Sequence, residues 1–152
     1  MINFPKSLKF SEADIKKARA HADRKRMNMN SYEGAFRGEL AEIVLARELE
    51  KNHKVVENDE DKTHQYEWDL KVDDVCVDVK TSAGKTITVG YLTLEHDTKN
   101  YLFPCYAYKD THFDLLGVLN GAQIKELVQD SNYGGFFIWN KTVVEHSIQK
   151  GK

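Results

Sequence analysis

The alternation of apolar and polar residues is clearest between residues 67 and 80, where it predicts a β-hairpin. Apolar side chains recur at every second position: Trp68, Leu70, Val72, Val75, Val77 and Val79. The other side is polar: Glu67, Asp69, Lys71, Cys76, Asp78 and Lys80. A two-residue turn at 73–74 places Asp69 opposite Asp78 and Lys80 opposite Glu67. A loop of odd length would expose several apolar side chains, at about 1.5 to 3 kcal/mol each.

Residues 34–51 have the composition and periodicity of an α-helix. Its apolar positions follow helical spacing: Phe36, Leu40, Ile43 and Val44. At about 100° per residue, Glu39 lies at the edge of this apolar stripe, where an unpaired carboxylate is costly. We therefore expect a cation beside Glu39, either a metal ion or a basic side chain such as Arg47. Glu42, one turn later, is expected to be more exposed and is the alternative helix carboxylate.

Ser11 and Asp14 have the spacing of a capping box and predict another helix from about residue 11 to residue 27. This helix is rich in basic residues, and a further lysine follows the predicted hairpin. The candidate contacts to nucleic-acid phosphates are Lys16, Lys17, Arg24, Lys25, Arg26 and Lys85. A run of charges is also typical of a solvated helix face, so both interpretations stay open.

The second half of the chain predicts the remaining elements of one mixed α/β domain that spans residues 1–152. The expected elements are strands at 101–108, 113–119 and 135–139 and a short helix at 122–129. This region is rich in aromatic residues. We expect them mainly to pack the strands, with base stacking by one of them as the alternative.

The chain has 152 residues and a net charge of −2, which fits a small globular domain but does not by itself indicate nucleic-acid binding. No apolar run reaches the length of a membrane span or a signal peptide, so we expect a cytoplasmic protein that does not associate with membranes. Cys76 and Cys105 lack a metal-binding spacing and are expected to stay reduced. Residues 84–86 match the end of a P-loop, but Val79 occupies the position of the required glycine, so no nucleotide cofactor is expected.

Two carboxylates directly opposite each other on a sheet repel, so their pairing points to a cation between them. Oxygen ligands of this kind suit Mg²⁺ or Mn²⁺. A lysine on the same side adds a group that can position water or stabilise negative charge. The polar side of the hairpin is therefore a candidate metal site made of Asp69 and Asp78, with Lys80 beside it. An ordinary solvated sheet face is the alternative interpretation.

A helix that carries a glutamate, followed by a hairpin with an aspartate on its first strand and D-x-K on its second, resembles the PD-(D/E)xK nuclease superfamily. The matching residues are Glu39, Asp69, Asp78 and Lys80. The similarity covers residues 34–82, and Trp68 stands where the name-giving proline would be. The resemblance implies a restriction-endonuclease-like α/β core of αβββαβ type, with a central mixed β-sheet flanked by helices. It also implies that all four residues act in catalysis and that the three carboxylates bind the metal.

By this resemblance the chain is expected to be a Mg²⁺-dependent DNA endonuclease in which Mn²⁺ can substitute. The chain is too short for a separate target-reading domain, so we expect low sequence specificity or recognition of DNA structure, and a homodimer that cuts both strands. One alternative is a catalytically silent module that binds nucleic acid or a protein partner, which the net negative charge would suit. Another is cleavage of RNA, which uses the same chemistry.

Overall fold

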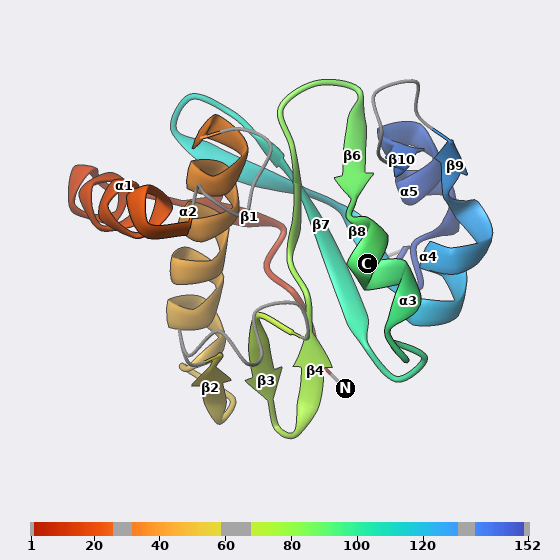
Figure 1. The fold of residues 1–152 in the computed structure, drawn as a ribbon. Helices are drawn as coiled ribbons and strands as arrows, with labels where there is room; N and C mark the ends of the chain where they lie inside the picture. Colours follow the sequence, from red (N-terminus) through yellow and green to blue (C-terminus); the bar gives the residue numbers. More distant parts are fainter. Residues whose placement is uncertain (1, 26–31, 59–67, 131–135, 151–152) are drawn as a thin grey trace.

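A curled, mixed β-sheet flanked by helices forms the framework of the chain (Figure 1). The computed structural model describes residues 2–25, 32–58, 68–130 and 136–150. The helices are α1 (Glu12–Lys25), α2 (Tyr32–Leu49), α3 (Tyr91–Glu95), α4 (Gly121–Leu127) and α5 (Asn140–His146). The strands are β1 (Ser7–Lys9), β2 (Val55–Glu57), β3 (Leu70–Val72), β4 (Val75–Val77), β5 (Lys80–Ser82), β6 (Thr86–Val89), β7 (Leu102–Tyr108), β8 (His112–Asn120), β9 (Gln129–Asp130) and β10 (Phe136–Trp139).

The strands form two sheets. The larger sheet has the order β1–β8–β7–β4–β3–β2, and β5 also pairs with β7. β4 and β5 run parallel to β7, whereas the other neighbouring strands of this sheet are antiparallel. The smaller sheet has the order β6–β10–β9. The predicted mixed α/β class, with helices flanking a mixed sheet, is therefore confirmed.

The β3–β4 hairpin has the register that the sequence predicts. Residues 70 to 72 pair with residues 75 to 77, and Asp73 and Asp74 form the turn. Both turn residues have positive φ angles, of 48° and 70°, as a two-residue type I′ turn requires. The Asp73 carboxylate also accepts a 2.9 Å hydrogen bond from the Lys54 N–H. Aspartate enters the left-handed region more readily than most residues, so the turn is compatible with the sequence.

β4 and β5 are two parts of one path along β7. Val77 pairs with Leu102 and Lys80 pairs with Cys105, so both strands keep the same offset from β7. Between them, the Asp78 N–H donates a 3.0 Å hydrogen bond to the Leu102 carbonyl. The parallel partner strand therefore fixes the positions of Asp78 and Lys80 along the sheet.

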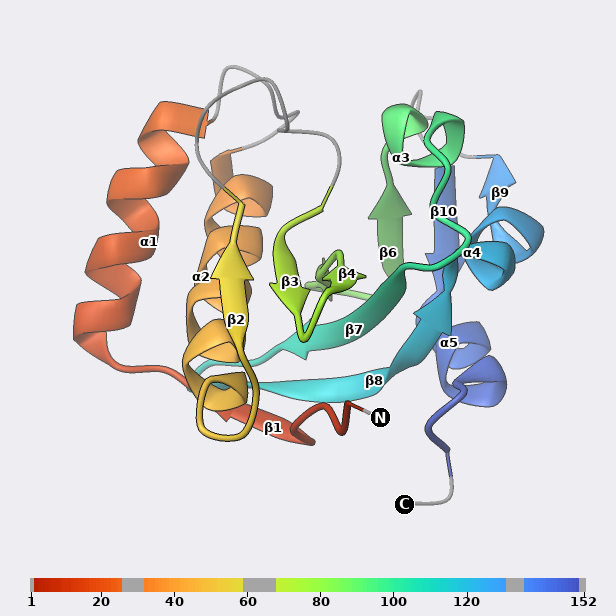
Figure 2. The same cartoon turned by 90° about the horizontal axis from the view of Figure 1, so that it is seen from below.

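The helix pair α1–α2 covers one face of the larger sheet (Figure 2). The predicted capping box is present, because the Ser11 N–H donates to Asp14 at 2.9 Å and the Asp14 N–H donates to the Ser11 Oγ at 3.2 Å. Arg47 of α2 donates to both oxygens of Asp14, at 2.7 and 3.0 Å. The same carboxylate thus caps α1 and joins it to α2.

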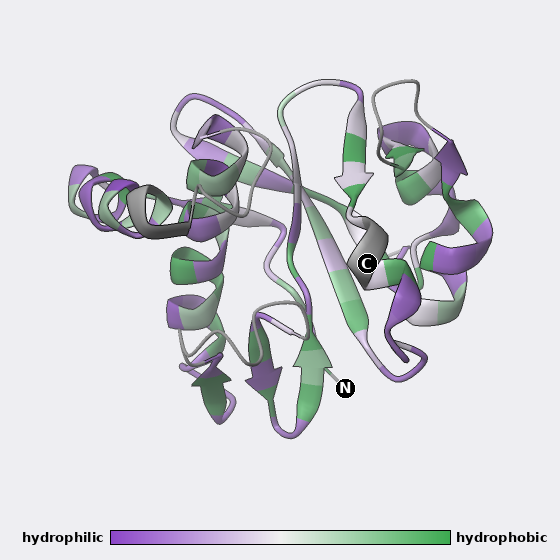
Figure 3. Cartoon of the chain, viewed as in Figure 1, coloured by the Kyte–Doolittle hydropathy of each residue, from purple (hydrophilic) through white to green (hydrophobic). Residues whose placement is uncertain are grey.

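Two apolar cores lie on opposite faces of β7. The core under the helix pair includes Phe36, Leu40, Val44, Leu70, Val77 and Tyr106. The core under the smaller sheet includes Ile87, Val89, Phe103, Cys105, Leu119 and Ile138. β4, whose Val75 and Val77 pack in the core under the helix pair, is coloured as hydrophobic along its whole length in Figure 3. Of the described helices, none combines the length and apolar character needed to cross a membrane.

The elements predicted for the second half are also present. The predicted strands at 101–108, 113–119 and 135–139 correspond to β7, β8 and β10, and the predicted helix at 122–129 corresponds to α4. The Asn120 side chain caps α4, accepting a 2.9 Å hydrogen bond from the Gln123 N–H. Several short elements were not predicted, namely β1, β2, β6, β9, α3 and α5.

Two glycines in different surroundings test this packing. A Cβ added at Gly121 would lie 1.8 Å from the carbonyl oxygen of Thr98, whereas a Cβ at Gly38 would meet nothing within 4 Å. We expect Gly121→Ala to lower the free energy of unfolding by about 1 to 3 kcal/mol, because backbone atoms must move apart. Gly38→Ala lies within α2 and is expected to raise it by about 0.5 to 1 kcal/mol. Denaturant unfolding of both variants measures the difference, and a Gly121→Ala protein as stable as wild type would contradict the packing at α4.

Candidate active site

The predicted aspartate pair is present at the hairpin. Asp69 and Asp78 interact directly, because the charge of Asp78 and a hydrogen bond with its side chain both raise the pKa of Asp69. Asp69 is fixed twice, because its N–H donates a 2.9 Å hydrogen bond to the Val77 carbonyl and its Oδ2 accepts a 2.8 Å hydrogen bond from the Val79 N–H. Asp78 is fixed by the pairing with β7. The backbone therefore holds two acidic groups together.

Lys80 projects to the same side as the two aspartates. Its Nζ lies 3.4 Å from Oδ1 of Asp78, and the side chains of Lys80 and Asp78 are only 15% and 13% exposed. The ammonium group also faces the ring of Phe103, at 6.0 Å from the ring centroid. Cys105 is buried nearby, and burial raises the pKa of its thiol to about 12, so this thiol is neutral. The charged groups thus lie against an apolar and uncharged surface of β7.

The site has two carboxyl groups but one ammonium group among Asp69, Asp78 and Lys80. Burial raises the pKa of Asp69 well above its usual range, and the charge of Asp78 raises it further, although Lys80 and the Val79 N–H act in the opposite direction. Burial lowers the pKa of Lys80, but the charges of Asp78 and Asp69 outweigh this effect and raise it above its ordinary value. Two carboxylates therefore share one ammonium group. A divalent cation that binds both aspartates would neutralise the remaining negative charge.

Glu39 is buried on α2 but is paired with α1. Its Oε2 lies 3.3 Å from Nδ1 of His21, and its side chain is 7% exposed. Arg47, the basic partner suggested by the sequence, binds Asp14 instead, so that suggestion is wrong. Glu42 is partly exposed, as expected. Among the residues that the structure describes, no cluster of three or more His, Cys, Asp or Glu side chains has the arrangement of a metal site. Asp69, Asp78 and Lys80 are the predicted site residues that interact with one another, and a metal-binding role for Glu39 stays a prediction.

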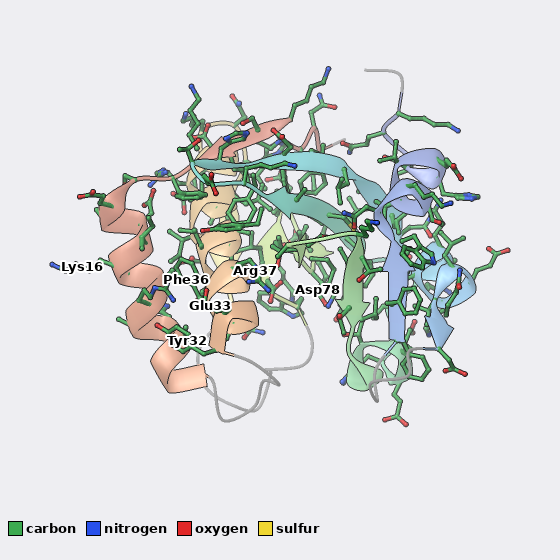
Figure 4. All side chains as sticks on the ribbon, turned by 90° about the horizontal axis from the view of Figure 1, so that it is seen from above. Lys16, Tyr32, Glu33, Phe36, Arg37 and Asp78 are labelled. Carbon is green, nitrogen blue, oxygen red and sulfur yellow. The ribbon has the colours of Figure 1, made fainter. Side chains whose placement is uncertain are left out.

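The basic residues expected to contact phosphates lie on separate elements. Lys16 and Lys17 are exposed on α1, and Figure 4 shows Lys16 on the outer side of that helix, away from Asp78. Lys85 is exposed immediately before β6. The remaining predictions lie outside the described part of the structure, which omits the side chains of Arg24 and Lys25 and all of Arg26 and Glu67.

Arg37 is a basic residue that the sequence reasoning did not single out. Figure 4 shows Arg37 on the side of α2 nearer to Asp78, whereas Phe36 lies toward α1. Arg19 is already engaged, because its guanidinium carbon lies 3.8 Å from the ring centroid of Phe36 and its Nη1 lies 3.0 Å from Glu33. Helical spacing could have identified Arg37 from the sequence, because it places this residue outside the apolar stripe of α2. Arg37 is thus a further candidate for phosphate binding.

Comparisons with known proteins do not identify the chain. No protein-family model matches it, and no curated protein matches it significantly. The functional interpretation therefore depends on the residues of the site and on their geometry.

The raised pKa of Asp69 predicts that this residue destabilises the metal-free protein. Its pKa is higher in the folded chain than in the unfolded chain, where the ordinary value of 3.8 applies. The folded state therefore binds more protons, and stability falls as the pH rises through the window between the two pKa values. Asp69→Asn removes this charge and keeps an oxygen for the Val79 N–H. We expect the variant to unfold at a higher temperature than wild type at neutral pH in chelator, by about 2 to 4 °C for each kcal/mol gained.

The difference between Asp69→Asn and wild type should shrink as the pH falls toward 4, because both side chains are then neutral. Thermal unfolding across that pH range measures it. Asp130→Asn, at an exposed position of β9, is the matched control and is expected to leave the profile nearly unchanged. A metal-free Asp69→Asn protein that is less stable than wild type at neutral pH would contradict the assigned repulsion.

Proposed function

We propose that the chain is a Mg²⁺-dependent DNA endonuclease with low sequence specificity or a preference for DNA structure. The observation that carries the proposal is the close pair of Asp69 and Asp78 with the Lys80 ammonium group beside it. Carboxylates in this arrangement are costly to fold, so a role in binding a cation gives a reason for their presence. We further propose that α2, β3, β4 with β5, and β7 form a restriction-endonuclease-like core, which the order of these elements supports.

The two aspartates fit a magnesium ion. Mg²⁺ is usually bound through one or two carboxylates together with water and substrate phosphate oxygens, so Asp69 and Asp78 are sufficient protein ligands. Mn²⁺ accepts the same oxygen ligands. When bound, the metal would neutralise the scissile phosphate and lower the pKa of a bound water. Glu39 could support this ion directly or through water only if it gave up or shared its contact with His21.

Lys80 is suited to position groups rather than to remove protons. Its raised pKa keeps the ammonium group protonated at neutral pH, so it can donate hydrogen bonds to a phosphate oxygen or to the attacking water. The contact with Asp78 fixes the position of Nζ, the Phe103 ring lies over it at 6.0 Å, and the Lys80 side chain is only 15% exposed. A fixed positive charge in a partly dry site stabilises the negative charge that develops during phosphodiester hydrolysis.

The proposal predicts metal-dependent nicking of plasmid DNA. Asp78→Asn and Lys80→Met are expected to slow cleavage by about 100-fold or more, because each removes a group that acts on the reacting phosphate. Chelation is expected to stop cleavage, and Mn²⁺ is expected to restore it. Conversion of supercoiled plasmid, followed on gels with Mg²⁺, measures these effects.

Lys125→Met and Asp130→Asn are the matched controls, since both positions are exposed on α4 and β9. Both are expected to cleave like wild type. Equal cleavage by Asp78→Asn and wild type would contradict the assignment of the site. Parallel reactions with RNA, single-stranded DNA and branched DNA separate the substrate classes, and protein that binds these substrates without cleaving them would support a catalytically silent module instead.

A further inference from the structure

The outer face of the smaller sheet carries two neighbouring aromatic rings. In β10, Ile138 points into the core and pairs with Ile87 of β6, and both are fully buried. The alternating residues Phe137 and Trp139 therefore lie on the opposite face. Their ring centroids are 5.3 Å apart with planes at 88°, and Trp139 is 37% exposed. We call this face the Phe137–Trp139 surface.

The surroundings of these two rings are polar. Thr88 pairs with Phe137 and Thr86 pairs with Trp139 across β6, while Gln129 pairs with Phe137 on the other side. Hydroxyl and amide groups beside exposed aromatic rings can hydrogen-bond the edges of nucleobases whose faces stack on the rings. The centre of a protein-binding patch is usually more apolar than this. The surface therefore fits unpaired bases better than a protein partner.

Positive charge lies at the Trp139 end of the surface. Lys85 precedes Thr86, the cross-strand partner of Trp139, and Lys141 follows in α5; both lysines are exposed. Asn140 holds this corner together, because its N–H donates a 2.8 Å hydrogen bond to the Lys85 carbonyl and its Nδ2 donates a 2.8 Å hydrogen bond to the Gly84 carbonyl. The backbone that carries the two exposed lysines is thus held next to the strands of this surface, and their positive charge complements a phosphate backbone.

We propose that the Phe137–Trp139 surface binds single-stranded nucleic acid. Unpaired bases stack on the two rings, the threonines contact base edges, and Lys85 and Lys141 contact phosphates. The inference goes beyond the proposed nuclease and does not require cleavage, because the surface lies on β6 and β10 whereas Asp69 and Asp78 lie at the β3–β4 hairpin (Figure 1). Stacking is tolerant of base identity and available on both DNA and RNA, so the shared chemistry is an unpaired base with its phosphate.

The test is equilibrium binding in chelator, so that no metal-dependent cleavage occurs. Fluorescence anisotropy with labelled dT15, rU15 and a 15-base-pair DNA duplex distinguishes the two single strands from paired DNA. Wild type is expected to prefer the single strands. Trp139→Ala is expected to bind them about 5- to 100-fold more weakly, whereas Trp139→Phe, which keeps a ring, is expected to retain most of the affinity. Lys85→Ala is expected to lower the slope of log affinity against log salt by about 0.7.

Val144→Ala, at an exposed apolar position of α5, is the matched control and is expected to bind like wild type. Asp78→Asn is also expected to retain binding of single strands. Failure of the nuclease proposal therefore leaves this inference intact, and failure of this inference leaves the nuclease proposal intact. Unchanged binding by folded Trp139→Ala, or equal affinity of wild type for duplex and single strands, would overturn the inference. A third result would also overturn it: wild type binds no single strand but associates with itself, and Trp139→Ala abolishes this self-association. The surface would then be an interface between copies of the chain.

Discussion

Two carboxyl groups held in contact at a partly buried position repel each other, and the rest of the hairpin region must supply the free energy that keeps them there. Leu70, Val72 and Val77 are fully buried on the opposite side of the same strands. Each such side chain contributes about 1.5 to 3 kcal/mol when it is removed from water. Their burial is possible only in the register that also brings Asp69 and Asp78 together. The apolar core under α2 therefore stabilises a polar arrangement that would not form by itself.

Backbone hydrogen bonds in the same region fix the positions of the two aspartates. The peptide groups of Asp78 and Val79 lie between β4 and β5, where ladder pairing is interrupted. The Asp78 N–H nevertheless reaches Leu102, and the Val79 N–H reaches the Asp69 carboxylate. A buried N–H without a partner would be costly, so Asp69 also serves the interrupted strand. Its side chain thus has a structural partner, and this hydrogen bond helps to keep it facing Asp78.

The parts of the site that could be predicted are those that depend on local sequence. The register follows from period-two alternation and a turn of two aspartates, and the cap of α1 follows from Ser11 and Asp14 three positions apart. The partner of Glu39 could not be predicted in this way, because His21 meets it only after α1 docks on α2. Short strands such as β1 and β6 are likewise defined by distant partners, β8 and β10, rather than by their own three or four residues.

A short segment connects the candidate active site to the smaller sheet, the two regions on which the functional proposals rest. Lys80 begins β5, and only the turn after Ser82 separates that strand from Lys85 and β6. The turn is closed locally, since the Gly84 N–H donates a 3.4 Å hydrogen bond to the Ser82 Oγ. It is also tied to α5 through the two hydrogen bonds from Asn140. Ser82 itself pairs with Ala107 of β7. Because both ends of this short connection are held, the backbone position of Lys85 is fixed relative to the strand that carries Lys80.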